Sequence, residues 1–571
     1  MEVIIIIVII LAALIAKGIY DNRQYTKKLY RKAVKSFGKE PAKDITYARA
    51  EAISYYSNHR DKSECHVDNI TWEDTDMPRI YGKLNSCCCA IGEEYLYYLL
   101  RNPSSSDEEL AERERVIDHF LKDEKSRNDL AVRLLKIGYL KNISAYEYIN
   151  RLRSVDKDSS TIHILQALLL LGSIGFIFIN PVYGVLLTIV VFFFNVITYF
   201  KRKTLVEGYF TIVFFILRLL EQARELKETH DEELKPYFDK ITSKAEAFGK
   251  MKRNSIFIMT GAGAGPLELF FDYFKMAFHI DLIKFNTMLK EFSGHVDEFE
   301  SIFETVGFLD CMLAVASYRK LHEGAYSIPV LKGCSGTIKA QKLAHPLLND
   351  PVTNDLDTAA PVLLTGSNAS GKSTFLKTVA LNAIMAQSIH TVLAAGYESG
   401  MFRVMTSMAL RDDIESGESY YIVEIKSLKR IIDAAGSSGK TSGNNAENNR
   451  DKADHIPILC FIDEVLRGTN TVERIAASTQ ILRGLSNTDS LCIAATHDIE
   501  LTHLLEDKFD NYHFEEQIQD DQIIFDYKLK SGRATSRNAI SLLRIMGYSP
   551  ETVESALKMA ERYVQTGEWS L

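Results

Sequence analysis

A phosphate-binding loop constrains this chain more than any other feature. Residues 366–373 read Gly-Ser-Asn-Ala-Ser-Gly-Lys-Ser, between an apolar segment at 362–365 that predicts a strand and a stretch at 374–387 that predicts a helix. In that setting consecutive backbone N–H groups point at an oxyanion, and the helix N-terminus adds a favourable dipole. Lys372 can reach the β- and γ-phosphates and Ser373 can hold a magnesium ion. Taken alone, the motif also has a plainer interpretation, a Gly/Ser-rich turn without a ligand.

Two further apolar segments end in polar residues. Residues 458–462 lead into Asp463 and Glu464, and residues 491–495 lead into Thr-His-Asp. Apolar runs without alternation are typical of strands buried on both faces of a parallel sheet, where ligands collect at the carboxyl edge. A lone His after a strand, such as His497, is more often structural than catalytic. Three such elements in this order nevertheless predict a nucleoside triphosphatase.

The combination of four blocks is more specific than the loop. The segments TGSNASGKST, DDIESGESYYIVEI, FIDEVLRGTNT and AATHDIELTH resemble the ATPase domain of the MutS mismatch-repair family, and the likeness extends over Ala360–Arg562. Two upstream segments, Ala90–Pro103 and Gly307–Arg319, are similar to parts of that family's lever domain. The resemblance implies a multidomain chain. A helical lever or core region would precede a C-terminal α/β P-loop ATPase domain of the ABC type.

The resemblance also implies site residues, with ATP and Mg²⁺ as cofactors. Ser373 and Asp463 would serve the metal, Glu464 would polarise the attacking water, and His497 would sense the γ-phosphate. The residues expected to bind the triphosphate form one continuous stretch: Gly366, Ser367, Asn368, Ala369, Ser370, Gly371, Lys372, Ser373 and Thr374.

A second group of residues is expected to act across a subunit boundary. The resemblance implies that Ser416, Gly417 and Ser419 approach the nucleotide of a second subunit, which predicts a homodimer with composite sites. A Ser-Gly turn at a helix N-terminus also offers N–H donors for a phosphate. From the residues alone, Ser419 is equally well explained as the N-cap of the helix expected over Ile422–Ile432.

A long uncharged run separates the two lever-like segments. Ser159–Phe200 contains 42 residues without Asp, Glu, Lys or Arg, which is about two membrane spans of roughly 20 residues each. Asn180-Pro181 would form the turn between them, and Lys201-Arg202-Lys203 forms a basic boundary typical of the cytoplasmic side. A buried hairpin in a soluble core is the alternative, although amphipathic helices of soluble domains keep a charged face.

The N-terminal segment points to the membrane as well. Val3–Ala16 is uncharged, and Lys17–Lys39 holds eight Lys/Arg and one acid, Asp21. A cleaved signal peptide would place its positive charge before the apolar core. We therefore expect either an anchor with everything after Lys17 in the cytoplasm or a membrane-surface helix that contacts anionic lipid. Both place the protein at the membrane and the ATPase domain in the cytoplasm.

The chain also departs from the family. Fewer than 90 residues precede the lever-like segment at Ala90, so we expect no mismatch-reading domain and no preference for mismatched DNA. The interval expected to hold a DNA clamp, between about Tyr148 and Asp297, opens instead with the uncharged run. Net charge is −8 and the pI is about 6.0, so there is no global basic footprint for nucleic acid. The eight cysteines, including the run Cys87–Cys89, are interpreted as reduced cytoplasmic thiols.

The expected domains follow this order: an N-terminal membrane anchor, 1–20; a cytoplasmic helical region with the start of the lever, 21–158; a transmembrane hairpin, 159–203; a helical lever or core region, 204–335; and the ATPase domain, 336–571, with a flexible insertion at 436–455.

Three functions fit this layout. The first is an ATP-driven dimeric clamp that acts on double-stranded DNA near the membrane. The second is a membrane-bound ATPase switch whose partner is a protein or a lipid, with DNA binding lost. The third, a transporter-type ATPase subunit, ranks last because the chain lacks the pattern LSGGQ and three spans leave little room for a translocation pathway.

Overall fold

The architecture comes from a computed structural model. The structure describes residues 2–41, 46–154, 160–249, 251, 273–367, 370–408, 420–439, 456–519, 522–534, 540, 543–544 and 546–566. The chain divides into two compact units. A helical unit contains residues 1–60, 83–98 and 115–321, and a second unit contains residues 61–82, 99–114 and 322–571.

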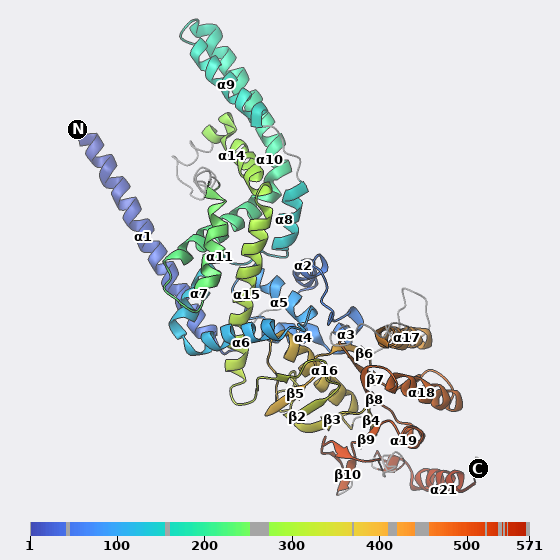
Figure 1. The fold of residues 1–571 in the computed structure, drawn as a ribbon. Coiled ribbons are helices and arrows are strands. Elements are labelled where there is room, and N and C mark those ends of the chain that lie inside the picture. Colours follow the sequence, from blue (N-terminus) through green and yellow to red (C-terminus); the bar gives the residue numbers. More distant parts are fainter. Residues whose placement is uncertain are drawn as a thin grey trace, which may run out of the picture. The chain divides into compact units, whose positions relative to one another are not determined.

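The described secondary structure of the helical unit consists of helices (Figure 1). Those that lie wholly within it are α1 (Glu2–Ser36), α2 (Tyr47–Asn58), α7 (Glu124–Ile137), α8 (Ala145–Ser154), α9 (Ser160–Phe176), α10 (Pro181–Glu225), the short 3-10 helix η1 (Leu226–Glu228), α11 (Lys235–Glu246), α14 (Ile280–Ser293) and α15 (Val296–Leu321). Three more helices contain residues of both units: α4 (Met77–Leu84), α5 (Ala90–Arg101) and α6 (Asp107–Lys122).

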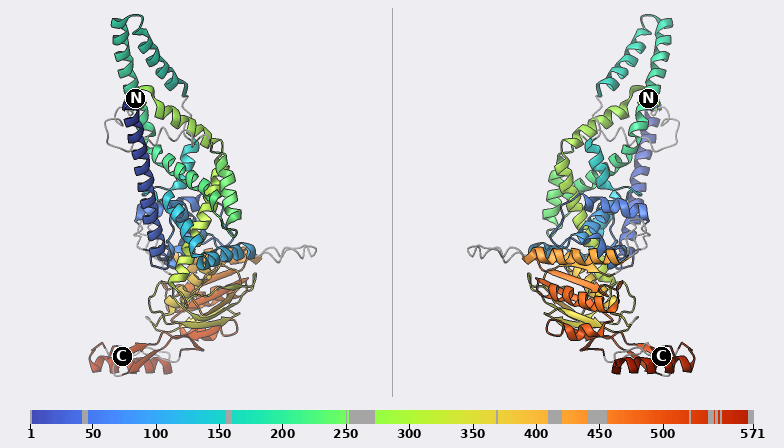
Figure 2. Two further views of the ribbon diagram at one scale, coloured as in Figure 1. Left: turned by 90° about the vertical axis from the view of Figure 1, so that its left-hand side faces the viewer. Right: turned by 90° about the vertical axis from the view of Figure 1, so that its right-hand side faces the viewer.

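The uncharged run forms two antiparallel helices, α9 and the first part of α10, which we call the apolar hairpin (residues 160–204; Figures 1 and 2). The turn lies where the sequence predicts it. Asn180 caps α10, its side chain accepting a hydrogen bond from the Tyr183 N–H at 3.3 Å, and Pro181 occupies the first turn. Gly184 allows close approach, because a Cβ there would lie 2.5 Å from Ile177 Cα. α10 then continues past Lys201–Lys203 without a break.

Length and composition support fewer membrane spans than the sequence predicts. Among the described helices, Pro181–Thr204 within α10 is long and apolar enough to cross a membrane, with a mean hydropathy of 2.1. α9 is apolar but has only 17 residues. The expectation of several transmembrane helices is therefore not confirmed by length and composition.

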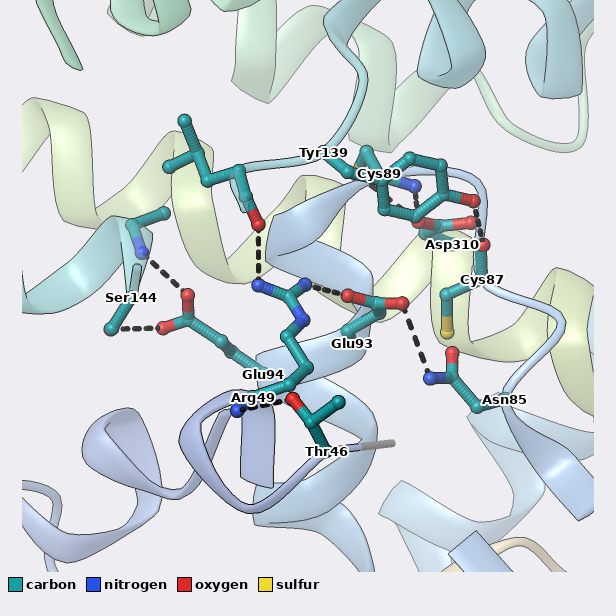
Figure 3. A network of polar contacts seen from close by, with 12 residues as sticks. Thr46, Arg49, Asn85, Cys87, Cys89, Glu93, Glu94, Tyr139, Ser144 and Asp310 are labelled. Atoms are coloured by element: carbon teal, nitrogen blue, oxygen red, sulfur yellow. Dashed lines mark hydrogen bonds and ion pairs between the residues drawn. The ribbon is translucent and has the colours of Figure 1, made fainter. Parts of the chain in front are cut away.

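Buried carboxylates hold the helical unit together near the start of α5 (Figure 3). Asp310 of α15 accepts the N–H groups of Cys88 and Cys89 at 2.8 and 2.9 Å, and so caps α5 from more than 200 residues away. Glu94 accepts hydrogen bonds from the Ser144 hydroxyl at 2.8 Å and the Ala145 N–H at 2.6 Å at the start of α8. Burial raises the pKa of Glu94 to about 8, although these hydrogen bonds oppose the shift. The run of cysteines thus lies at a helix junction.

The second unit is built on a six-stranded sheet of order β12-β9-β4-β8-β7-β6. Five of its strands run parallel, and only β12 is antiparallel to its neighbour. Its strands are β4 (Val362–Thr365), β6 (Arg403–Ser407), β7 (Ile458–Asp463), β8 (Ser490–Ala495), β9 (Asp510–His513) and β12 (Lys530–Ser531). The central strands β4, β7 and β8 are almost wholly buried, as their unbroken apolar sequences predict.

Further strands and helices complete this unit. This unit also contains a four-stranded sheet of order β1-β5-β2-β3 and a two-stranded hairpin, β10-β11. Their bounds are β1 (Val330–Leu331), β2 (Ile338–Leu343), β3 (Asn354–Thr358), β5 (Gly396–Ser399), β10 (Glu516–Gln519) and β11 (Gln522–Phe525). The helices are α3 (Asn69–Asp74), α16 (Lys372–Ser388), α17 (Tyr420–Gly439), α18 (Thr471–Ser486), α19 (Ile499–Leu504) and α21 (Pro550–Thr566).

Several local predictions for this unit are confirmed. The phosphate loop stands between β4 and α16, and the segments before Glu464 and Thr496 are strands. The helix expected over Ile422–Ile432 is α17, which extends to Gly439 and so enters the insertion expected at 436–455. Residues 440–455 lie outside the described part of the chain.

Two short segments from the first fifth of the chain pack into the second unit. In α3, the Asp74 carboxylate accepts a hydrogen bond from the Thr406 hydroxyl at 2.7 Å, at the end of β6. In α6, Arg113 donates to the Ser388 carbonyl at 2.7 Å, at the end of α16. These contacts join residues some 270 to 330 positions apart, and no local sequence pattern announces them.

Candidate nucleotide site

The phosphate loop has the backbone that its glycines permit. Gly366 and Gly371 have φ of +147° and +107°, a region that side chains disfavour. A Cβ on Gly366 would also lie 2.6 Å from the Phe514 carbonyl oxygen. Asn368 and Ala369, which the sequence assigns to the triphosphate, lie outside the described residues.

Lys372 lies inside the curve of this loop. Its Nζ donates to the carbonyl oxygens of Gly366 and Ser367 at 2.8 and 2.9 Å. The residue is only 5% exposed, and this burial lowers the pKa of Lys372 to about 8, against the opposing charges of Asp463 and Glu464. A buried ammonium group at this point can bind an anion.

Two oxygen donors face each other beside the loop. The Ser373 hydroxyl donates a hydrogen bond to the carboxylate of Asp463, which ends β7. Burial raises the pKa of Asp463, and the hydrogen bond from Ser373 counteracts that shift. A hydroxyl and a carboxylate are hard oxygen ligands of the kind that Mg²⁺ takes alongside phosphate oxygens and water. The donor set therefore fits the magnesium ion that the sequence implies.

Glu464 lies between the side chains of His497 and Arg467 at the same edge. Its Oε1 is 2.6 Å from His497 Nε2, and its Oε2 is 2.9 Å from Arg467 Nε. The hydrogen bond with His497 is the main reason that the pKa of Glu464 is lowered below its ordinary value. His497 also lies 3.4 Å from Lys372 Nζ, through its Nε2. An ionised carboxylate in this position can accept a proton from, or orient, a water molecule near the phosphates.

A cavity of about 480 Å³ opens beside the loop. Its lining includes predicted residues, Ser367 and Gly371 to Thr374, together with Glu464. Sequence reasoning missed the apolar and aromatic wall that completes it, which consists of Leu343, Leu348, Val352, Phe375, Phe514 and Tyr527. These side chains come from separate elements, and no motif marks them.

The structure thus brings together most of the predicted site and leaves part of it undescribed. Lys372, Ser373, Asp463, Glu464 and His497 meet because β4, β8 and β7 are neighbours in the parallel sheet. Ser370 is buried within the loop, and Thr374 lines the cavity. Ser416, Gly417 and Ser419 lie outside the described residues. Arg467 was not predicted, although its position three residues after Glu464 is a signal that could have found it.

Comparisons with known proteins agree with this geometry. The family model described as MutS domain V matches residues 362–440 and 451–564. The chain is 30% identical over 279 residues to "MutS protein homolog 4" of Mus musculus, covering 46% of this chain and 26% of that protein. It is 31% identical over 261 residues to "DNA mismatch repair protein MutS" of Pseudothermotoga lettingae, covering 44% and 30%. It is 29% identical over 304 residues to "DNA mismatch repair protein MSH3" of Meyerozyma guilliermondii, covering 49% and 29%.

The chain spans about a quarter to a third of the length of these relatives, and the matched part contains the phosphate loop, Asp463, Glu464 and His497. Sequence likeness and site geometry therefore point to the same chemistry: residues 362–440 and 451–564 are similar to MutS domain V, and this part of the chain holds a phosphate loop beside the carboxylates and imidazole that ATP hydrolysis uses.

Proposed function

We propose that this protein is a membrane-anchored, Mg²⁺-dependent ATPase that works as a dimer. Within the site, Lys372 binds the phosphates, Ser373 and Asp463 hold the ion, and Glu464 orients the attacking water. The ion, when bound, neutralises charge on the phosphate oxygens. His497 supports Glu464 through their 2.6 Å contact and lies close enough to Lys372 to respond to the γ-phosphate.

The proposal of a membrane anchor rests on the outer surface of the apolar hairpin. Large apolar side chains point outward along both helices, among them Leu165 at 67%, Leu186 at 64% and Ile197 at 67% exposure. Only 22% of the apolar stretch Pro181–Thr204 is buried, whereas the core helix of a soluble domain is mostly buried. Soluble proteins rarely expose apolar patches of more than a few hundred Å². A lipid bilayer is the environment that covers such a surface.

Several polar groups of the hairpin face inward instead. His163 of α9 and His279, just before α14, are both buried and share a 2.9 Å contact between their Nδ1 atoms. The Asn195 side chain donates to the Ala277 carbonyl at 2.9 Å, and the Tyr199 hydroxyl donates to Asp281 at 2.5 Å. Apolar outside and polar inside is the arrangement of helices in lipid, where polar side chains turn toward protein partners.

α1 adds a second contact with the same membrane. Its N-terminal end and the tip of the hairpin point toward the same end of the helical unit (Figures 1 and 2). The eight basic residues of Lys17–Lys39 are all exposed. Basic residues next to an apolar segment favour the cytoplasmic leaflet, whose lipids are anionic. This supports a cytoplasmic location for the ATPase domain.

Vesicle flotation tests the anchoring. The full chain should float with liposomes and stay bound through high salt and alkaline carbonate, because the apolar side chains of the hairpin would be buried in the bilayer. Leu186→Arg with Phe193→Arg should weaken this binding, since Arg in a helix centre costs about 2.5–3.5 kcal/mol in membrane insertion. Val330→Arg, at an exposed apolar position of β1, is the matched control. Release of the unaltered chain by carbonate would contradict the proposal.

The target of the ATPase is proposed in two versions. The names of two relatives mention DNA mismatch repair, which favours the first version, in which the target is DNA. The net charge of −8 favours the second version, a switch that acts on a protein or lipid partner. The ATPase rate in nanodiscs, with and without duplex DNA, decides between them. Stimulation by DNA supports the first version, and an unchanged rate supports the second.

A further inference from the structure

The loop that carries Glu464 is held in a strained conformation. Glu464 and Leu466 have φ of +56° and +57°, although neither is glycine. A non-glycine residue in this region is strained and persists only where its surroundings impose the conformation. The direction of the Glu464 carboxylate, toward His497, depends on this backbone. Whatever imposes the strain therefore controls the position of the group that orients water.

Three sets of contacts hold the loop. The Glu464 N–H donates to the Ala495 carbonyl at 2.9 Å, and the Val465 carbonyl accepts the Ser478 hydroxyl at 3.1 Å. The loop also meets the carboxylate of Glu424 in α17, whose pKa the backbone N–H groups of residues 466–468 help to lower. The Arg467 N–H lies 3.2 Å from Glu424 Oε1.

The carboxylate of Glu424 is unusual because it is buried. It is only 2% exposed, and burial raises the pKa of its carboxyl while the three backbone N–H groups counteract that shift. Among the described residues its Oε2 has no hydrogen-bond partner, and no Lys, Arg or His forms an ion pair with it. A buried carboxylate is costly unless it is satisfied. The hydrogen bond that this carboxylate does receive, at Oε1, comes from the backbone of the loop.

α17 also touches the loop sterically. A Cβ on Gly468 would lie 3.2 Å from Cβ and Cδ2 of Tyr421, one turn before Glu424. The helix itself begins at Tyr420, directly after Ser419. Two contacts therefore join the loop to the first turns of α17: the hydrogen bond to the Glu424 carboxylate and the close packing of Gly468 against Tyr421.

Building on the ATPase function proposed above, we propose that Glu424 is a positioning residue for ATP hydrolysis: its carboxylate accepts the Arg467 N–H and so holds the loop, and with it Glu464, in the orientation that serves the attacking water. Glu424 does not line the nucleotide cavity, so it acts through the loop rather than on the substrate. Its loss should slow turnover and leave nucleotide binding in place.

The test compares Glu424→Ala and Glu424→Gln with Asp433→Ala, a control on the exposed face of the same helix. For Glu424→Ala we expect kcat to fall on the order of 10- to 100-fold, the penalty of a misplaced catalytic group. The Kd for a non-hydrolysable ATP analogue should change less than about twofold, because Lys372 and its loop are untouched. The kcat of Glu424→Gln should lie between those of Glu424→Ala and Asp433→Ala, since the amide oxygen of Gln still accepts hydrogen bonds. A normal kcat in Glu424→Ala, or equal losses in kcat and binding, would overturn the proposal.

A second variant separates positioning from general stability. Gly468→Ala disturbs the same junction without altering Glu424, and it should give the same loss of kcat with nucleotide binding in place. If Glu424→Ala does not fold, Glu424→Gln and Gly468→Ala decide, and a normal kcat in both refutes the proposal.

Discussion

At the scale of single residues, the site depends on charged groups held away from water. Lys372 is buried and Glu464 is ionised, and the two are linked through His497. Shielding from water raises the free-energy cost of an unpaired charge and strengthens the interaction of that charge with a binding partner. Their protonation states therefore set the pH range of the enzyme.

Nucleotide affinity should fall at alkaline pH. The pKa of Lys372 is lowered to about 8, so the side chain loses its proton as pH rises through that value, and the contact with phosphate requires the proton. We expect the Kd of a fluorescent ATP analogue to rise by up to about tenfold per pH unit above pH 8. Lys372→Arg keeps its charge at these values and should show a flat profile. A flat profile in the unaltered protein would contradict the role of Lys372.

Glu464→Gln should separate binding from hydrolysis. The substitution removes the group that orients water and keeps Ser373 and Asp463 in place for the metal. We expect kcat to fall by about 10²- to 10⁴-fold, the usual contribution of a general base, with nucleotide affinity unchanged. Single-turnover hydrolysis measures the step directly. A normal rate would mean that another group orients the water.

At the scale of elements, the apolar hairpin depends on one close approach. Gly184 lies against the backbone of Ile177, whereas Gly172 on α9 has open space around the position of a Cβ. Gly184→Ala should therefore destabilise the turn, even though alanine favours helix by about 1 kcal/mol. Gly172→Ala should leave the unfolding temperature of the detergent-solubilised protein unchanged or raise it. Equal effects of the two substitutions would show that the helices do not meet at Gly184.

At the scale of the whole molecule, a composite site predicts complementation between inactive subunits. A Lys372→Ala chain loses its phosphate contact, and a Ser416→Ala chain loses the group proposed to reach the partner's nucleotide. In a mixed dimer one site would pair an intact loop with an intact Ser416. Mixing should therefore give more ATPase activity than the average of the two mutants. Activity equal to that average would argue for sites that work alone.

The acidic balance of the molecule limits how it can contact DNA. With a net charge of −8, contact is confined to local basic clusters that touch the phosphate backbone. Such contacts do not read sequence, and affinity should fall steeply as salt rises. We therefore expect equal binding of mismatched and matched duplex at each salt concentration, measured by fluorescence anisotropy. A salt-tolerant preference for the mismatch would contradict this prediction.

Local sequence determined the parts of this protein that depend on neighbouring residues. Glycine spacing forms the phosphate loop, unbroken apolar runs form buried strands, and Asn180-Pro181 starts α10. Each of these depends on backbone dihedrals, capping or hydrophobic periodicity within about a dozen residues. The carboxylates after β7 were predictable for the same reason, because the carboxyl end of a parallel strand is where ligands collect.

Tertiary structure alone decided which distant residues meet. The order β4-β8-β7 brings His497 between Lys372 and Glu464, and packing places Asp74 at the end of β6. Glu424 shows the difference most clearly. By sequence it is one acidic residue in an amphipathic helix, and in the fold it is a buried carboxylate that holds a strained loop. Such roles arise from burial and from hydrogen bonds across long sequence separations, and these exist only once the elements have packed.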